Sequence, residues 1–86
     1  MERAWVSSPA YRAMIAGLVA VRTELGVGQR ELARRLGKHP SWLNKVERLE
    51  RRLDVAEFVA VARALQVAPQ ALMAKLAEGL PQDLGI

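Results

Sequence analysis

The chain has 86 residues, enough for one small hydrophobic core but too few for a second domain or a deep substrate cleft. It contains no cysteine, which excludes disulfides, a thiolate nucleophile and a cysteine zinc site. Hydrophobic residues make up 51% of the chain and aromatic residues 5%, and no stretch alternates strictly between apolar and polar residues as a half-buried strand does. We therefore expect an all-α protein.

The net charge of +4 is unevenly distributed along the chain. Residues 27–52 contain eight Lys or Arg and three Glu, a local charge of +5, whereas the rest of the chain carries −1. A concentrated positive charge is typical of a surface that contacts nucleic-acid phosphates, although a basic patch alone is as often a solvated helix surface. No apolar stretch reaches the roughly 18 residues of a membrane span, and the N-terminus lacks the basic segment and apolar core of a secretory signal. We expect a soluble, cytoplasmic protein.

Residues 1–8 have no clear periodicity and are predicted to form an N-terminal arm. Ser8 can cap the first free N–H groups of a helix and Pro9 is favoured at its first position, so the first helix is predicted over residues 9–25, before Gly26. Its apolar residues Met14, Ile15, Leu18, Val19 and Val21 lead to Leu25 at its end.

Two short helices are predicted next, over residues 28–36 and 40–48. Gly37 can adopt the left-handed conformation that ends a helix, and Pro40 suits the first turn of the following one. This arrangement is a helix-turn-helix, whose second helix can lie in the major groove of DNA. On the inner side, Leu43 and Val46 are expected to pack on the preceding helix at Leu32, Ala33 and Leu36. The residues predicted on the outer side are Ser41, Trp42, Asn44, Lys45 and Arg48.

A fourth helix is predicted from about Asp54, because Asp54 and Glu57 have the spacing of a capping box. A fifth starts near Pro69 and ends before Gly79. The predicted organisation is therefore an arm over residues 1–8, a five-helix domain over residues 9–78 and a tail over residues 79–86.

The sequence of residues 18–73 resembles the Cro- and XRE-type helix-turn-helix family of bacterial and phage regulators. The segments that carry the resemblance are Leu25-Gly26-Val27 before Gln29, Glu31-Leu32-Ala33, Leu36-Gly37, Trp42-Leu43-Asn44-Lys45-Val46-Glu47 and Ala62-Arg63-Ala64-Leu65. The resemblance implies a compact bundle like the DNA-binding domain of lambda repressor. The residues themselves offer no glycine-rich phosphate loop, metal-ligand cluster or paired carboxylates, so we expect no enzymatic activity, no cofactor and no metal.

The resemblance also implies roles for individual residues. Gln29 matches a glutamine that holds a DNA phosphate, and Lys45 is the leading candidate for reading a base, since lysine can donate to guanine. Arg22 and Glu47 match an ion pair that joins the first helix to the end of the third. The full set of DNA-binding candidates is Gln29, Arg30, Lys38, His39, Pro40, Ser41, Trp42, Lys45, Arg48, Arg51 and Arg52.

Several of these positions have alternative interpretations. His39 is expected to be a helix cap or a phosphate contact and not a metal ligand or catalytic base, and Pro40 can offer a base only apolar contact. Trp42 either stacks on DNA or covers the core. Gly28 replaces the usual Ser or Thr cap of the second helix. Leu49 replaces a glycine, so it either adopts a left-handed conformation or lets the third helix continue.

The predicted function is that of a homodimeric transcription regulator, a repressor that reads a pseudo-palindromic operator in double-stranded DNA. The alternative is an antitoxin or adaptor whose main partner is a protein. The residues predicted to form the dimer interface are Leu72, Met73, Leu76 and Leu80, with Trp5 and Val6 of the arm.

Overall fold

The computed structural model describes residues 8–85, and within that range the chain forms five helices and no strand. The predicted arm, with Trp5 and Val6, lies outside the described residues. The helices are α1 (Pro9–Glu24), α2 (Gln29–Leu36), α3 (Pro40–Glu47), α4 (Val55–Ala64) and α5 (Pro69–Glu78). The all-α, five-helix prediction is confirmed.

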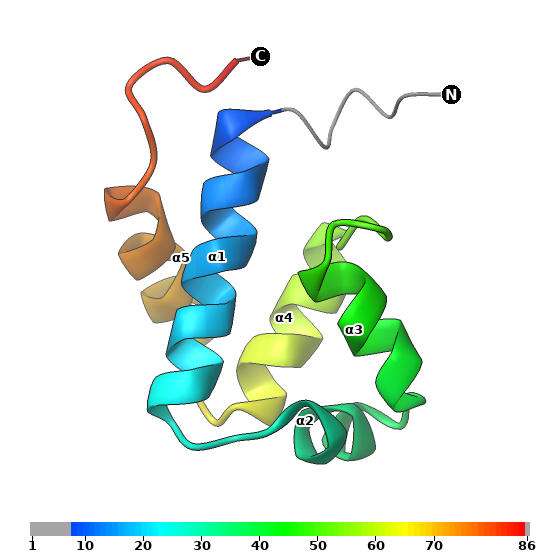
Figure 1. The fold of residues 1–86 in the computed structure, drawn as a ribbon. Helices are drawn as coiled ribbons and strands as arrows, with labels where there is room; N and C mark the ends of the chain where they lie inside the picture. The colour runs from blue at the N-terminus through cyan, green and yellow to red at the C-terminus, as the bar shows by residue number, and fades with distance from the viewer. Residues whose placement is uncertain (1–7, 86) are drawn as a thin grey trace.

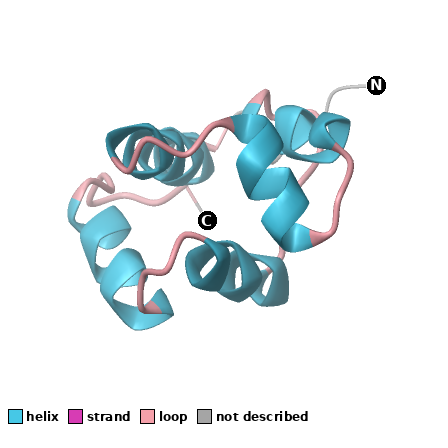
Figure 2. Cartoon of the chain, turned by 90° about the horizontal axis from the view of Figure 1, so that it is seen from below, coloured by secondary structure: helices cyan, strands magenta, loops and turns pink. Residues whose placement is uncertain are grey.

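The helices pack around one hydrophobic core. Loops join them in succession, as Figures 1 and 2 show. Helix α1 lies beside α5, and α2 crosses the base of the molecule between α4 and α3. Helix α3 packs on α2 and on α1, so that it occupies one side of the molecule (Figure 1). None of the described helices is both long and apolar enough to cross a membrane.

The predicted helix starts are confirmed in detail. The Ser8 hydroxyl accepts a hydrogen bond from the Tyr11 N–H at 3.3 Å. At the start of α4, the Asp54 carboxylate accepts from the Glu57 N–H at 2.7 Å while the Glu57 carboxylate accepts from the Asp54 N–H at 3.0 Å. This reciprocal pair is the predicted capping box. Gly28 precedes α2 and supplies no side-chain cap.

The helix ends show which positions adopt a left-handed backbone. Gly37 ends α2 with φ 69°, as expected. Leu49 has φ 63°, and α3 ends at Glu47, so the leucine accepts the strained conformation and the helix does not continue. Gln66, after α4, has φ 61°, which the sequence analysis did not anticipate.

The core is built from all five helices. Its fully buried larger side chains are Leu32, Leu43, Val46, Val61 and Leu72. Leu25, at the C-cap of α1, is 49% exposed. The prediction that Leu72 and Leu76 form a dimer surface is wrong, since they are only 1% and 6% exposed and belong to the core.

The C-terminal part of the chain approaches α1 closely at two glycines, Gly17 and Gly85. A Cβ atom at Gly17 would lie 2.5 Å from Leu76 Cδ2, so the glycine lets α5 pack closely on α1. A Cβ atom at Gly85 would lie 3.4 Å from Pro9 Cδ. The segment after α5 therefore returns to the beginning of α1 (Figure 1).

Candidate nucleic-acid interface

Helix α3 is seated on α2 by its apolar face. Leu43 and Val46 are 1% and 0% exposed, and Leu32 and Ala33 of α2 are 1% and 0% exposed. The turn between the helices closes through the Lys38 N–H, which donates to the Ala33 carbonyl at 2.9 Å. Because both inner faces are buried, the rotation of α3 about its own axis is fixed, and so is the set of residues on its outer side.

The start of α3 is capped by the single histidine of the chain. Nδ1 of His39 accepts a hydrogen bond from the Ser41 N–H at 3.1 Å and lies 2.9 Å from the Ser41 hydroxyl. Pro40 occupies the first turn, where a missing N–H costs nothing. The cap places His39 and Ser41 together at the exposed N-terminal end of α3.

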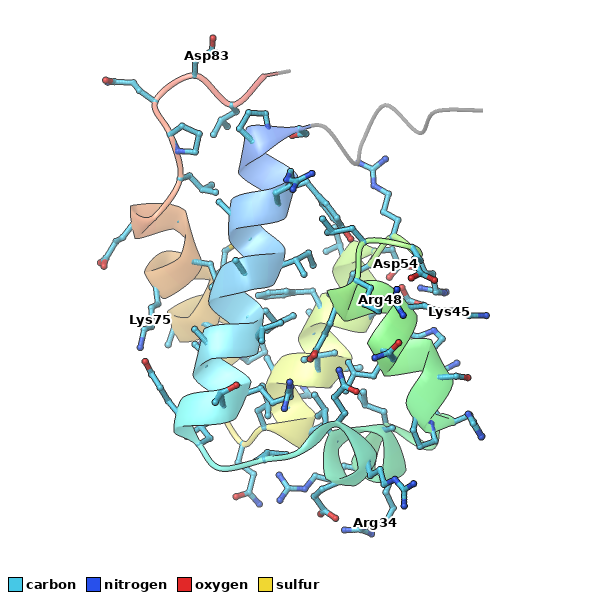
Figure 3. The ribbon with its side chains drawn as sticks, in the orientation of Figure 1. Arg34, Lys45, Arg48, Asp54, Lys75 and Asp83 are labelled. Carbon is cyan, nitrogen blue, oxygen red and sulfur yellow. The ribbon has the colours of Figure 1, made fainter. Side chains whose placement is uncertain are left out.

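The outer side of α3 and the loop after it carry exposed cations. Lys45 extends from α3 away from the bundle (Figure 3). Arg48 forms an exposed ion pair with Glu50 at 3.1 Å, and Arg52 lies over the Tyr11 ring with 5.9 Å from Cζ to the ring centroid. The exposed residues among the DNA-binding candidates are Arg30, Lys38, His39, Ser41, Lys45, Arg48 and Arg52. This surface is the one most able to attract phosphates.

A half-buried polar network lies beneath that surface. Arg22 Nε and Nη2 donate to the two carboxylate oxygens of Glu47 at 2.7 and 2.9 Å, and the two side chains are 13% and 10% exposed. Arg22 Nη1 donates to the Val27 carbonyl at 2.8 Å. Gln29 Nε2 donates to Glu47 at 2.7 Å and its oxygen accepts from Asn44 at 3.4 Å. The structure thus brings together Arg22 and Glu47, and it ties Gln29 to the same carboxylate.

Trp42 and Asn44, both predicted on the outer side of α3, are only partly exposed. Trp42 is half-buried and packs against the core, and its Nε1 is buried without a hydrogen-bond partner among the described residues. Of the two interpretations of Trp42, the core-covering one matches this placement. Asn44 is half-buried as well, since it bonds to Gln29. The prediction placed both residues too far outward because the periodicity of eight residues does not resolve the flanks of so short a helix.

Trp42 is also the centre of a charged cluster. Lys38 Nζ lies 5.5 Å and Arg51 Cζ 5.1 Å from the centroid of its ring. Arg51 donates to both carboxylate oxygens of Glu57 at 2.9 and 2.8 Å and to the Arg52 carbonyl at 2.7 Å. The hydrogen bond from Arg51 lowers the pKa of Glu57, and the same contact raises the pKa of Arg51. The sequence predicts only the helix-capping role of Glu57 and not this contact.

On α2, the basic residues are partly neutralised. Glu31 accepts from Arg34 at 2.6 Å and from Arg35 at 2.9 Å, and these contacts lower its pKa to about 2. Arg35 also donates to the Ala64 carbonyl at 2.9 Å. Figure 3 shows Arg34 at the base of the molecule, below α2. Because both arginines bind Glu31, Arg34 and Arg35 fit a solvated helix surface better than a phosphate site.

Comparison with known proteins agrees with this geometry. A helix-turn-helix family model matches residues 18–72. An XRE-family like protein from Pseudomonas syringae pv. tomato str. DC3000 has a similar structure with a TM-score of 0.76 and 42% sequence identity, over 84% of this chain and 88% of that one. No relative was found among curated protein sequences.

Two further solved structures share the fold. The clp gene regulator ClgR from C. glutamicum gives a TM-score of 0.73 at 24% identity, over 86% of this chain and 96% of that one. A point mutant of the restriction-modification controller protein C.Esp1396I gives 0.72 at 20% identity, over 91% and 92%. Since the family model spans most of the chain and the Pseudomonas protein is close in sequence, the chain belongs to the Cro- and XRE-type helix-turn-helix family of DNA-binding transcription regulators, which are not enzymes.

Proposed function

We propose that the protein is a homodimeric repressor that reads a pseudo-palindromic operator with α3 of each subunit in the major groove. The observation that supports this proposal most strongly is the seating of α3. Leu43 and Val46 are buried, whereas Ser41 and Lys45 on the same helix are exposed. A recognition helix needs this combination, because base edges are read only by side chains whose direction is fixed.

Lys45 is the proposed base reader, and Ser41 contacts a base or a phosphate. Lys38 and His39 flank the helix start and suit the adjacent phosphates. Beyond α3, the exposed Arg48 and Arg52 grip the DNA backbone, where contacts add affinity without reading sequence.

The start of α2 suits a second phosphate contact. Gly28 leaves the first N–H groups of α2 without a side-chain cap, and helix N-termini favour anions. One N–H of the Gln29 amide donates to Glu47, which orients the amide and leaves the other N–H for a phosphate. The neighbouring Arg30 is exposed and adds positive charge.

The proposed dimer face lies between α1, α4 and α5. Val55 and Met73 are 81% and 41% exposed, and both line an apolar groove of about 140 Å³ that also reaches Tyr11 and Phe58. Among the α5 residues predicted for the interface, Met73 keeps an exposed apolar side chain. A single domain makes few base contacts, so a second copy supplies the missing affinity and specificity. Half-sites about 34–36 Å apart follow from the repeat of B-DNA.

DNase I footprinting of a genomic library from the source organism tests the proposal. The expected result is a protected pseudo-palindrome with two half-sites one helical turn apart, bound by two copies of the chain. Absence of any protected site, together with a stoichiometric protein partner on purification from native cells, would instead support the antitoxin or adaptor role.

A further inference from the structure

We propose that Arg51 is a positioning residue: by binding Glu57 and covering Trp42 it holds the loop after α3 in place, and it does not itself contact a DNA phosphate. This inference rests on the proposed function, because it concerns how the same surface meets DNA. It departs from the DNA-binding role that the family resemblance implies for Arg51.

The hydrogen bonds of Arg51 carry the argument. A guanidinium has five N–H donors in a planar fork. Here Nη1 and Nη2 are both engaged, with the two oxygens of Glu57 and the Arg52 carbonyl, at 2.7 to 2.9 Å. The guanidinium also lies over the Trp42 ring. These hydrogen bonds use three of the five donors and pair the guanidinium with a carboxylate, so a phosphate would meet a guanidinium whose charge is already paired, whereas Arg52 and Lys45 lie exposed nearby.

The cluster connects both ends of α3 to α4. Lys38, in the turn before α3, contacts the Trp42 ring, and Arg51, in the loop after α3, contacts the same ring. Glu57 holds Arg51 with the same carboxylate that caps α4. Because α4 belongs to the core, these contacts fix the loop that carries Arg52 relative to the recognition helix.

The positioning role of Arg51 predicts an effect of Glu57→Gln on DNA binding that is opposite to the effect predicted from charge alone. Glu57→Gln removes a negative charge from beside the basic surface, and by charge alone it should strengthen DNA binding. Glutamine also suits the capping box, so α4 keeps its cap. If Arg51 acts through Glu57, the substitution nevertheless weakens binding to the specific site, because the loop loses its anchor.

Arg51→Lys separates the positive charge of Arg51 from its bidentate contact with Glu57. Lysine keeps the positive charge but cannot form the bidentate contact with a carboxylate. The test measures affinity for the footprinted operator and for a scrambled duplex across a series of salt concentrations. Arg51→Lys and Glu57→Gln should each weaken operator binding about tenfold, with the salt slope of the wild type. The double variant should bind no more weakly than either single variant.

Glu50→Gln is the matched control, since it removes the same charge from the loop after α3, where Glu50 pairs with Arg48 and not with Arg51, and it should leave operator binding unchanged or stronger. Operator binding by Arg51→Lys equal to that of the wild type, with a salt slope reduced by about one in Arg51→Ala, would overturn the inference and make Arg51 a phosphate contact.

A measurement without DNA keeps the inference separate from the proposed function. In a Trp5→Phe background the fluorescence reports Trp42 alone. Emission should shift to longer wavelength in Arg51→Lys and in Glu57→Gln, and not in Glu50→Gln, while circular dichroism shows that all three stay helical. An unchanged Trp42 emission would overturn the cluster itself. Failure of the wild type to bind any duplex would overturn the proposed function, but the fluorescence result would still show whether Arg51 and Glu57 hold the surroundings of Trp42 in place.

Discussion

Arg22 and Glu47 are 25 residues apart in the chain and meet in a bidentate ion pair with nitrogen to oxygen distances of 2.7 and 2.9 Å. The pair joins α1 to Glu47, the last residue of α3. Only about a tenth of each side chain is exposed, at 13% and 10%, and the third guanidinium nitrogen of Arg22, Nη1, donates to the Val27 carbonyl. The pair therefore helps to hold the end of α3 against α1.

Removal of one partner of the pair of Arg22 and Glu47 should lower the free energy of unfolding. Arg22→Ala leaves the Glu47 carboxylate largely buried without its counter-ion, and we expect a loss of about 3 kcal/mol in the free energy of unfolding. Urea denaturation followed by circular dichroism measures it. Arg34→Ala, which removes an exposed ion pair on α2, serves as the control and should change stability little. Equal effects of the two substitutions would show that the pair of Arg22 and Glu47 does not hold α3.

Gln66→Gly should stabilise the protein. Gln66 is exposed and has φ 61°, a left-handed conformation that strains any residue with a Cβ atom. Relief of that strain outweighs the extra flexibility of glycine in the unfolded chain, so we expect a gain of about 0.5–1 kcal/mol. The thermal midpoint should rise. Gly26→Ala, at φ 72°, is the reverse experiment and should lower the midpoint; a fall in both variants would contradict the argument.

Acid should remove the contribution of Glu57 to stability. Its pKa is lowered in the folded protein by Arg51, so the stabilisation is fully present above the unfolded value of 4.5 and is lost as the pH falls through the folded value. We expect Glu57→Gln to reduce the urea midpoint at pH 7 and to have a much smaller effect near pH 3. An equal reduction at both pH values would mean that the charge of Glu57 is not what stabilises the fold.

Met73→Glu should disrupt the proposed dimer. Met73 lies exposed on the apolar groove between α1, α4 and α5, and a carboxylate there would have to be desolvated at an interface. Sedimentation equilibrium should show a shift from dimer to monomer while the helical content is retained. Ala71→Glu, at an exposed position on α5 that does not line the groove, is the matched control. A dimer that survives Met73→Glu would place the interface elsewhere.

The sequence predicted most of the fold because its local signals are strong. Ser8-Pro9, the Asp54 and Glu57 capping box and Gly37 each specify a helix boundary through backbone hydrogen bonding or a left-handed turn. The structural pairing of Arg22 with Glu47 came from the family resemblance, since nothing local connects residues so far apart.

The remaining features depend on tertiary packing, which local patterns do not encode. The apolar spacing of α5 gave no way to tell a core face from a dimer face, so Leu72 and Leu76 were assigned to the wrong one. The contact of Arg51 with Glu57 depends on the path of the loop after α3. Gln66 carries no residue-type signal at all, because glutamine is not typical of a left-handed position.

The most direct test of the account is a gel shift with Lys45→Ala and Arg52→Ala on the footprinted operator and on a scrambled duplex. Lys45→Ala should lose about 1–3 kcal/mol of discrimination between the two duplexes, whereas Arg52→Ala should weaken binding to both and reduce the salt slope by about one. Unchanged affinity and discrimination in both variants would contradict the claim that the exposed side of α3 reads DNA.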